Sequence, residues 1–192
     1  MTQATEKPPL MKWSLDRYHE LVKTGVLEDC RVELLNGEIV EMSPVDPVHD
    51  DTQEALVEYL RTKLGGRARV REAKAVTLPD NSEPIPDISV VRPQRYRNRH
   101  PYPEAVYLII EIANSRPGRD LGPKRQVYAQ AGIQEYWVFN LAKQELKVFR
   151  DVQGGDYQVE LTWSSPTINL IAFPDLTLET AVLRELAFQD GE

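Results

Sequence analysis

The sequence lacks most of the residues and motifs on which common catalytic sites depend. It has a single cysteine, Cys30, so neither an intrachain disulfide nor a cysteine-rich zinc site can form. We expect Cys30 to be a small, partly buried thiol in a chain that works in the reducing cytoplasm. Three scattered histidines supply no H-E-x-x-H zinc motif. The glycine-rich phosphate loops and the G-x-S-x-G nucleophile motif are also missing.

Long hydrophobic runs are absent as well. No stretch approaches the roughly eighteen apolar residues that cross a membrane, and the start, MTQATEKPPL, has no apolar centre like that of a secretory signal. With 41% hydrophobic and 28% charged residues, the 192-residue chain is long enough for one globular domain. We therefore expect a flexible leader over residues 1–13 and a single domain over residues 14–188.

Charge is unevenly distributed along the chain. The net charge is −7, but residues 61–100 hold ten basic and four acidic residues, a net of +6. A basic stretch in an acidic protein indicates either a phosphate-binding surface or one solvated face, and charge alone does not separate the two. The candidate phosphate-binding residues are Arg67, Arg69, Arg71, Lys74, Arg92, Arg95, Arg97 and Arg99.

Hydrophobic patterning predicts an alternating order of helices and strands. Asn36-Gly37 between two strand-like runs predicts a hairpin, because a type I′ turn needs positive φ at both residues. The predicted helices are 14–23, 51–64, 120–131 and 178–188; the predicted strands are 31–35, 38–42, 69–78, 85–91, 105–112, 135–141, 146–150 and 157–161. This order predicts an α/β (α+β) fold in which helices flank a mixed central sheet, with an N-terminal hairpin and extra C-terminal strands.

Two acids stand out within these apolar runs. Asp87 lies in IPDISVV and Glu111 near the end of AVYLIIEI, and a buried carboxylate is costly unless it is paired or binds a metal. If the two strands are neighbours, both carboxylates meet at one end of the sheet, where oxygen ligands suit Mg²⁺ or Mn²⁺. Lys124, in the following helix, could polarise a metal-bound water, or form a surface i,i+4 pair with Asp120.

These residues fall within a longer pattern that resembles a known family. The strings RVELLNGEIVEMSP, PDISVV, LIIEIANS, DLGPKRQVYAQAGIQEYWVFN and FPDLTL are similar to a large bacterial family of restriction-endonuclease-like proteins, across roughly residues 14–185. The resemblance implies the PD-(D/E)XK nuclease fold, a four-stranded mixed sheet flanked by helices. It also implies that Pro86-Asp87 supplies the PD element and Glu111 the second acid.

The sequence departs from the common pattern at one catalytic position. The lysine expected two residues after the second acid is replaced by Ala113. The resemblance implies that Lys124 takes its place, and that the main-chain carbonyl of Ile112 is a further metal ligand. Glu33 also matches a family position, either as a third carboxylate of the site or as a strand-edge acid paired with Arg31 or another basic residue.

Several other residues have two interpretations. His49 could contact a scissile phosphate or carry a proton, although a lone histidine there is more often a cap or turn residue. Tyr128, Tyr136 and Trp137 also match the family, but aromatics at such spacings usually belong to the core. Asp120 is expected to cap its helix or to orient Lys124.

The leading hypothesis is a Mg²⁺-dependent (or Mn²⁺-dependent) endonuclease that hydrolyses phosphodiester bonds in DNA. Asp87 and Glu111 would hold the metal, Lys124 and Glu33 would act with them, and the basic stretch would bind the DNA backbone. One alternative is a catalytically inactive nuclease fold that serves as a DNA-binding or assembly module, and another is a protein-interaction role without DNA. Cutting both strands usually needs two active sites, which suggests a homodimer.

Overall fold

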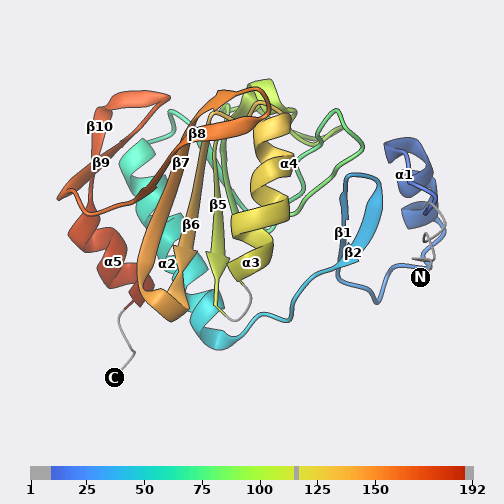
Figure 1. Cartoon of the computed structure of the whole chain (residues 1–192), viewed down its shortest axis with the longest axis horizontal. Helices are drawn as coiled ribbons and strands as arrows, with labels where there is room; N and C mark the ends of the chain where they lie inside the picture. Colours follow the sequence, from blue (N-terminus) through green and yellow to red (C-terminus); the bar gives the residue numbers. More distant parts are fainter. Residues whose placement is uncertain (1–9, 115–116, 189–192) are drawn as a thin grey trace, which may run out of the picture.

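A six-stranded mixed sheet forms the centre of the computed structural model, which describes residues 10–114 and 117–188 (Figure 1). The sheet order is β3-β4-β5-β6-β7-β8. The strands are β3 (Arg69–Glu72), β4 (Ile88–Val91), β5 (Val106–Ala113), β6 (Glu135–Asn140), β7 (Glu145–Gln153) and β8 (Asp156–Thr162). β5 and β6 run parallel and the other neighbouring strands antiparallel. The sheet therefore contains the four-stranded core that the resemblance implies, extended by β7 and β8.

Helices cover both faces of this sheet. α2 (Pro47–Leu64) and α5 (Thr180–Phe188) pack on one face, beside a hairpin of β9 (Thr167–Leu170) and β10 (Phe173–Glu179). The opposite face carries a continuous helical segment made of α3 (Pro117–Arg119), the π-helical turn η2 (Asp120–Lys124) and α4 (Arg125–Gln130). Two short 3₁₀ turns, η1 (Pro103–Ala105) and η3 (Leu141–Lys143), precede β5 and follow β6. The prediction of a mixed sheet flanked by helices is confirmed.

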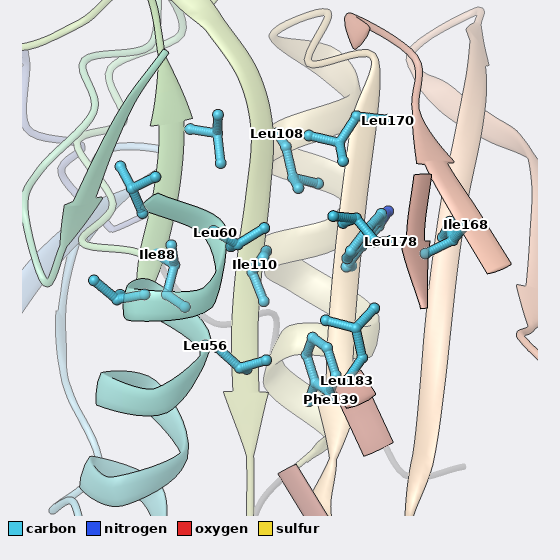
Figure 2. Close-up of a cluster of buried hydrophobic side chains, with 14 of the residues drawn as sticks. Leu56, Leu60, Ile88, Leu108, Ile110, Phe139, Ile168, Leu170, Leu178 and Leu183 are labelled. Carbon is cyan, nitrogen blue, oxygen red and sulfur yellow. The ribbon is translucent and has the colours of Figure 1, made fainter. Parts of the chain in front are cut away.

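Strand β5 shows how the sheet separates its two cores. Its side chains alternate, so that Leu108 and Ile110 pack with α2 in the cluster of Figure 2, while Ile109 packs on the α4 side. Glu111 also points to the α4 side, where it is 2% exposed. The alternation of side chains along β5, which buries its apolar residues, therefore also places the Glu111 carboxyl in the layer beneath α4.

An N-terminal arm lies beside this core. It consists of α1 (Leu15–Lys23) and the hairpin of β1 (Val32–Leu35) and β2 (Glu38–Glu41). Asn36 and Gly37 have φ of 50° and 73°, as the predicted turn requires. Backbone hydrogen bonds between Leu34 and Glu83 tie the hairpin to the loop that precedes β4. The hairpin is thus held against the core without belonging to the central sheet.

Several predicted boundaries were wrong for local reasons. The predicted 51–64 helix begins at Pro47, because Asp46 caps it by accepting a hydrogen bond from the His49 backbone N–H. The 69–78 strand ends at Glu72, and Ala73 then adopts a positive φ of 44°. The sequence did not reveal the β9–β10 hairpin, and Cys30 is exposed rather than partly buried. Residues 1–9 of the predicted leader lie outside the described residues.

The predicted 120–131 helix also begins earlier, at Pro117, so Asp120 lies inside it and does not cap it. Pro123 sits within this helical segment, where its ring would clash with the carbonyl group four residues earlier in a regular α-helix. The turn from Asp120 to Lys124 is instead π-helical, a single wider turn of the kind that occurs inside α-helices.

Two glycine substitutions test how the hairpin is seated. A Cβ on Gly37 would come within 2.9 Å of the Trp13 carbonyl oxygen, whereas a Cβ on Gly65, also at positive φ, would meet nothing within 4 Å. We expect Gly65→Ala to lower the free energy of unfolding by about 1 kcal/mol and Gly37→Ala by roughly twice as much, because only the second adds a clash to the φ penalty. Urea denaturation measures both; equal losses would show that the turn is not seated against Trp13.

Candidate active site

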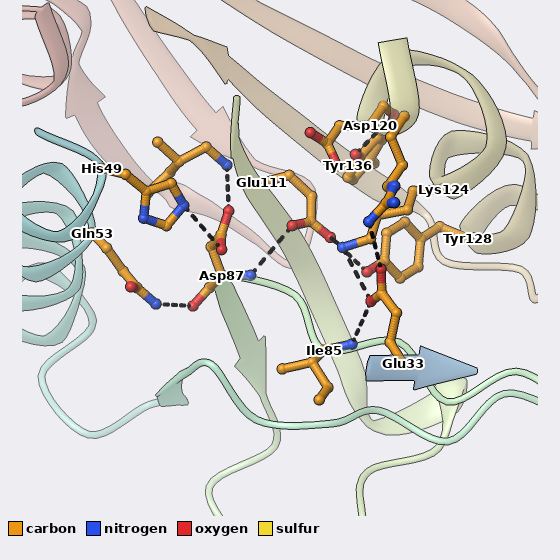
Figure 3. A network of polar contacts seen from close by, with 12 residues as sticks. Glu33, His49, Gln53, Ile85, Asp87, Glu111, Asp120, Lys124, Tyr128 and Tyr136 are labelled. Atoms are coloured by element: carbon orange, nitrogen blue, oxygen red, sulfur yellow. Dashed lines mark hydrogen bonds and ion pairs between the residues drawn. The ribbon is translucent and has the colours of Figure 1, made fainter. Parts of the chain in front are cut away.

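A pocket of about 90 Å³ opens at the end of the sheet where β4 begins and β5 finishes. Its lining includes the four residues that the sequence singled out, Glu33, Asp87, Glu111 and Lys124. They arrive from the hairpin, the start of β4, the end of β5 and the helical segment above the sheet (Figure 3). The structure therefore brings together residues that are up to 91 positions apart in the sequence, from Glu33 to Lys124.

Glu111 is the most enclosed of the acids. Its Oε1 accepts hydrogen bonds from the Tyr128 hydroxyl at 2.8 Å and from Lys124 Nζ at 3.0 Å. Its Oε2 is 3.4 Å from the backbone nitrogen of Asp87. Burial raises the pKa of the Glu111 carboxyl well above its ordinary value, although the charge of Lys124 opposes this shift. The site is thus a place where added positive charge stabilises the ionised acid.

Lys124 lies between two buried carboxylates. Its Nζ is 3.0 Å from Glu111 Oε1 and 3.2 Å from Glu33 Oε2, and the residue is only 4% exposed (Figure 3). Burial alone would lower the pKa of Lys124, but the charges of Glu111 and Glu33 outweigh it and raise the pKa above its ordinary value. The alternative of a surface pair with Asp120 is therefore wrong, because the ammonium group turns inward.

Glu33 joins the hairpin to this ion pair. Its Oε2 accepts a hydrogen bond from the Ile85 backbone nitrogen at 3.0 Å as well as contacting Lys124. Its Oε1 is buried and has no hydrogen-bond partner within the described residues; Arg119 is 4.0 Å away. Glu33 is paired with another basic residue, Lys124, and not with Arg31, while its role as a third carboxylate of the site stays a prediction. The carboxylate faces the pocket with one acceptor atom unused.

Asp87 lies immediately before β4, not inside it. Its Oδ2 accepts a hydrogen bond from the Ile112 backbone nitrogen at 2.6 Å, and its Oδ1 is 3.2 Å from His49 Nε2. Burial opposes the charged form of His49, but Asp87, with help from Asp50, raises the pKa of the imidazole above its ordinary value. His49 lies within the first turn of α2, so its interpretation as a cap or turn residue is wrong.

The two tyrosines that sequence reasoning assigned to the core are buried but also polar members of the site. Tyr128 bonds Glu111, and the Tyr136 hydroxyl donates to the Asp120 carbonyl oxygen at 3.0 Å, within the π-helical turn. Trp137 is a core residue whose indole nitrogen donates to Glu135. Only the side-chain hydroxyls, which no spacing pattern reports, distinguish the tyrosines from ordinary core aromatics.

Asp87 and Glu111 meet the requirements of a hard divalent cation. Asp87 Oδ1 and Glu111 Oε2 are carboxylate oxygens at the pocket, and burial makes added positive charge favourable at Glu111. Within residues 10–114 and 117–188, no group of three or more His, Cys, Asp or Glu side chains forms a ready metal cage. Mg²⁺ commonly uses one or two protein carboxylates and keeps several waters, so two oxygen ligands at a solvent-open pocket fit it.

Comparison with known proteins identifies the family. The chain matches the Uma2 family, described as "Putative restriction endonuclease", over residues 15–181. It belongs to this family. The crystal structure of "a putative nuclease belonging to DUF820 from Anabaena variabilis" is similar in fold, with 20% sequence identity, a TM-score of 0.73 and coverage of 94% of this chain and 100% of that chain. None of the curated proteins compared with the chain is significantly similar to it.

Most of the basic residues predicted to bind DNA lie away from this pocket. Arg69 pairs with Val91 at the other end of β3 and β4, and the Arg-rich loop 92–102 joins the far ends of β4 and β5. The four residues of β4 separate these ends from Asp87, and the first five residues of β5 separate them from Glu111, or about 13–17 Å. Arg67 forms a two-bonded pair with Asp175, and Lys74 lies nearer the site without lining the pocket. DNA binding by these residues stays a prediction of the sequence.

The Uma2 site contains two arginines that the sequence analysis did not select. Arg31 and Arg119 line the pocket beside Glu33. Arg31 lies two residues before Glu33 in an extended segment. Because side chains alternate along an extended chain, this spacing could have indicated that both face the same side.

None of the helices in the described part of the chain is long and apolar enough to cross a membrane.

Removing the central cation should destabilise the fold. Lys124→Met keeps the length of the side chain but leaves the Glu33 and Glu111 carboxylates facing each other without a counter-ion. We expect a loss of about 3–5 kcal/mol in the free energy of unfolding, measured by urea denaturation in EDTA. Lys143→Met, at an exposed position, is the matched control and should change little. Similar losses for the two variants would contradict the bridging role of Lys124.

The stability of the protein should depend on pH through Asp120. Burial raises the pKa of the Asp120 carboxyl from 3.8 to about 6, against the opposing charge of Lys124. Because the folded state favours the protonated acid, the wild type should lose stability relative to Asp120→Asn as the pH rises from 3.8 to about 6. Urea denaturation of both proteins across this range in EDTA measures the difference, and parallel curves would refute it.

Proposed function

We infer that the protein is a Mg²⁺-dependent endonuclease that hydrolyses phosphodiester bonds in DNA. Its membership of the Uma2 family and its nuclease-like fold support a nuclease in general terms. The observation that carries the finer proposal is the meeting of Asp87 and Glu111 with Lys124 in one pocket. Glu33 Oε1 adds a buried acceptor with no hydrogen-bond partner among the described residues, and such an atom is typical of a catalytic role or of a place for a bound water or ion.

The site residues divide the work of hydrolysis between them. Asp87 and Glu111 would hold Mg²⁺ or Mn²⁺, with the Ile112 carbonyl as a further ligand. The cation would polarise the phosphate and lower the pKa of a bound water. Lys124 spends two of its three N–H donors on Glu111 and Glu33, which leaves one for a water in the pocket. Glu33 Oε1 can accept a proton of that same water.

Two surrounding groups hold this arrangement in place. His49 orients Asp87 through the contact between Nε2 and Oδ1. Tyr128 fixes Glu111 Oε1, so that the opposite oxygen, Oε2, remains on the Asp87 side.

The cellular compartment and the oligomeric state are further parts of the proposal. The single exposed thiol of Cys30 agrees with a protein that works in the cytoplasm. Cleavage of both strands would call for a homodimer, because one chain supplies one such pocket.

Plasmid cleavage tests the proposal directly. Purified protein with Mg²⁺ or Mn²⁺ should nick or linearise supercoiled DNA, and EDTA should abolish the activity. Asp87→Asn and Glu111→Gln should abolish it as well, because each removes one charged metal ligand without changing side-chain size. The matched control is Asp51→Asn, on the exposed face of α2 and outside the pocket, which should cleave like the wild type.

Metal binding separates this function from the alternative of an inactive nuclease fold. Calorimetry with Mn²⁺ should show binding to the wild type and at least tenfold weaker binding to Asp87→Asn. A wild type that binds neither Mn²⁺ nor Mg²⁺ and cuts no plasmid would favour the DNA-binding or assembly module. Cleavage that survives Asp87→Asn would place the active site elsewhere.

A further inference from the structure

Two arginines at the pocket are not committed to short ion pairs. Arg31 is exposed just before β1 and lies two residues from Glu33, so the extended chain presents both on one face. Arg119 is partly buried in the turn before Asp120, with its guanidinium 4.0 Å from Glu33 Oε1. Within the described ranges, this long contact is the closest ion pair that either side chain makes. Both guanidinium groups are therefore available to an incoming anion.

The other charges of the pocket leave these arginines with a distinct task. The lining contains five carboxylates, from Glu33, Asp46, Asp87, Glu111 and Asp120. Lys124 is held by two of them and His49 by a third, so neither presents a free charge at the mouth. A phosphodiester brings one more negative charge into this acidic place. The phosphate oxygens need cationic hydrogen-bond donors. Apart from Lys124 and His49, the cationic donors in the lining are the guanidinium groups of Arg31 and Arg119.

The surface of α2, on the other side of the site, is acidic and does not suit a nucleic-acid backbone. α2 exposes four carboxylates, from Asp50, Asp51, Glu54 and Glu58. A groove that runs along this helix is lined by three of them together with Glu72. Gln53, in the same groove, donates to the Asp87 carbonyl oxygen, so the acidic groove borders the site directly. Arg61, the one cation among the groove's lining residues, is paired with Glu72, so a nucleic-acid backbone laid along this groove would meet a net negative charge.

The geometry points to a phosphate-binding pair: Arg31 and Arg119 hold the phosphodiester of the substrate against the pocket, and the nucleic-acid strand crosses the N-terminal arm and the π-helical turn, away from α2. This inference rests on the proposed function, because it assigns the substrate contacts of the same site. Guanidinium groups suit the task, since their planar fork bonds two phosphate oxygens at once. The Arg-rich loop 92–102, at the far end of the sheet, is not part of this path.

Equilibrium binding measures the contribution of each arginine. A short fluorescein-labelled DNA strand is titrated with protein in Ca²⁺, which occupies oxygen sites without supporting cleavage in most such enzymes. Arg31→Gln and Arg119→Gln should each weaken binding about tenfold, the effect of one charge-assisted hydrogen bond. Arg119→Lys should recover part of the loss, because it restores charge without the fork. Arg184→Gln, exposed on α5 at the opposite face of the sheet, is the matched control and should bind like the wild type. Arg95→Gln and Arg97→Gln, exposed on the distant loop, test the basic surface that the sequence predicted, and they too should bind like the wild type if the strand follows the proposed path.

Two further readouts separate this inference from the proposed function. Mn²⁺ affinity should be unchanged in Arg31→Gln and Arg119→Gln, which shows that the metal ligands and the fold remain intact. Wild-type DNA affinity in both variants, or a loss only in the Arg95 and Arg97 variants, overturns the inference even if plasmid is cleaved. A protein that binds DNA through Arg31 and Arg119 but cuts no plasmid keeps the inference and overturns the endonuclease.

Discussion

The buried ammonium group of Lys124 is the contact on which the rest of the site depends. It joins three parts of the chain at one point: Glu33 from the hairpin, Glu111 from the central sheet, and the helical segment that carries the lysine itself. Two carboxylates buried side by side repel each other strongly when both are charged. With the cation between them, the same pair becomes a brace that fixes the hairpin to the sheet.

The helix above the sheet, which carries Lys124, is irregular at Pro123. In a regular α-helix the Pro123 ring would clash with the carbonyl group four residues earlier. The wider π-helical turn instead points the Lys124 side chain in a different direction from the one that regular helical spacing predicts. Tyr136 holds the turn from below by bonding the Asp120 carbonyl oxygen. The strand has Ala113 where the PD-(D/E)XK pattern would have a lysine, and the irregular turn places the ammonium group of Lys124 beside Glu111 from above the sheet.

Much of this arrangement could be predicted from sequence, but not all of it. Two acids in apolar runs, Asp87 and Glu111, were visible because burying a charge is costly, and the Asn36-Gly37 turn because few residues adopt its backbone. The start of the helix at Pro117 could not be predicted, because Asp120 resembles a helix cap and Pro123 would then fall in the first turn, where proline is favoured. The roles of Arg31 and Arg119 depend on which cations are already paired, a property of tertiary structure that no residue pattern carries.

The hairpin's long-range contacts affect how the protein folds during its synthesis. Glu33 bonds Ile85 across 52 positions of the chain and contacts Lys124 farther on still. Contacts of such long range are slow to form, because much loop entropy is lost before they are made. During synthesis the hairpin emerges long before the helix that carries its counter-ion. Until that helix leaves the ribosome and docks, the site is incomplete, so a nascent or truncated chain carries the acids of the site without their assembly.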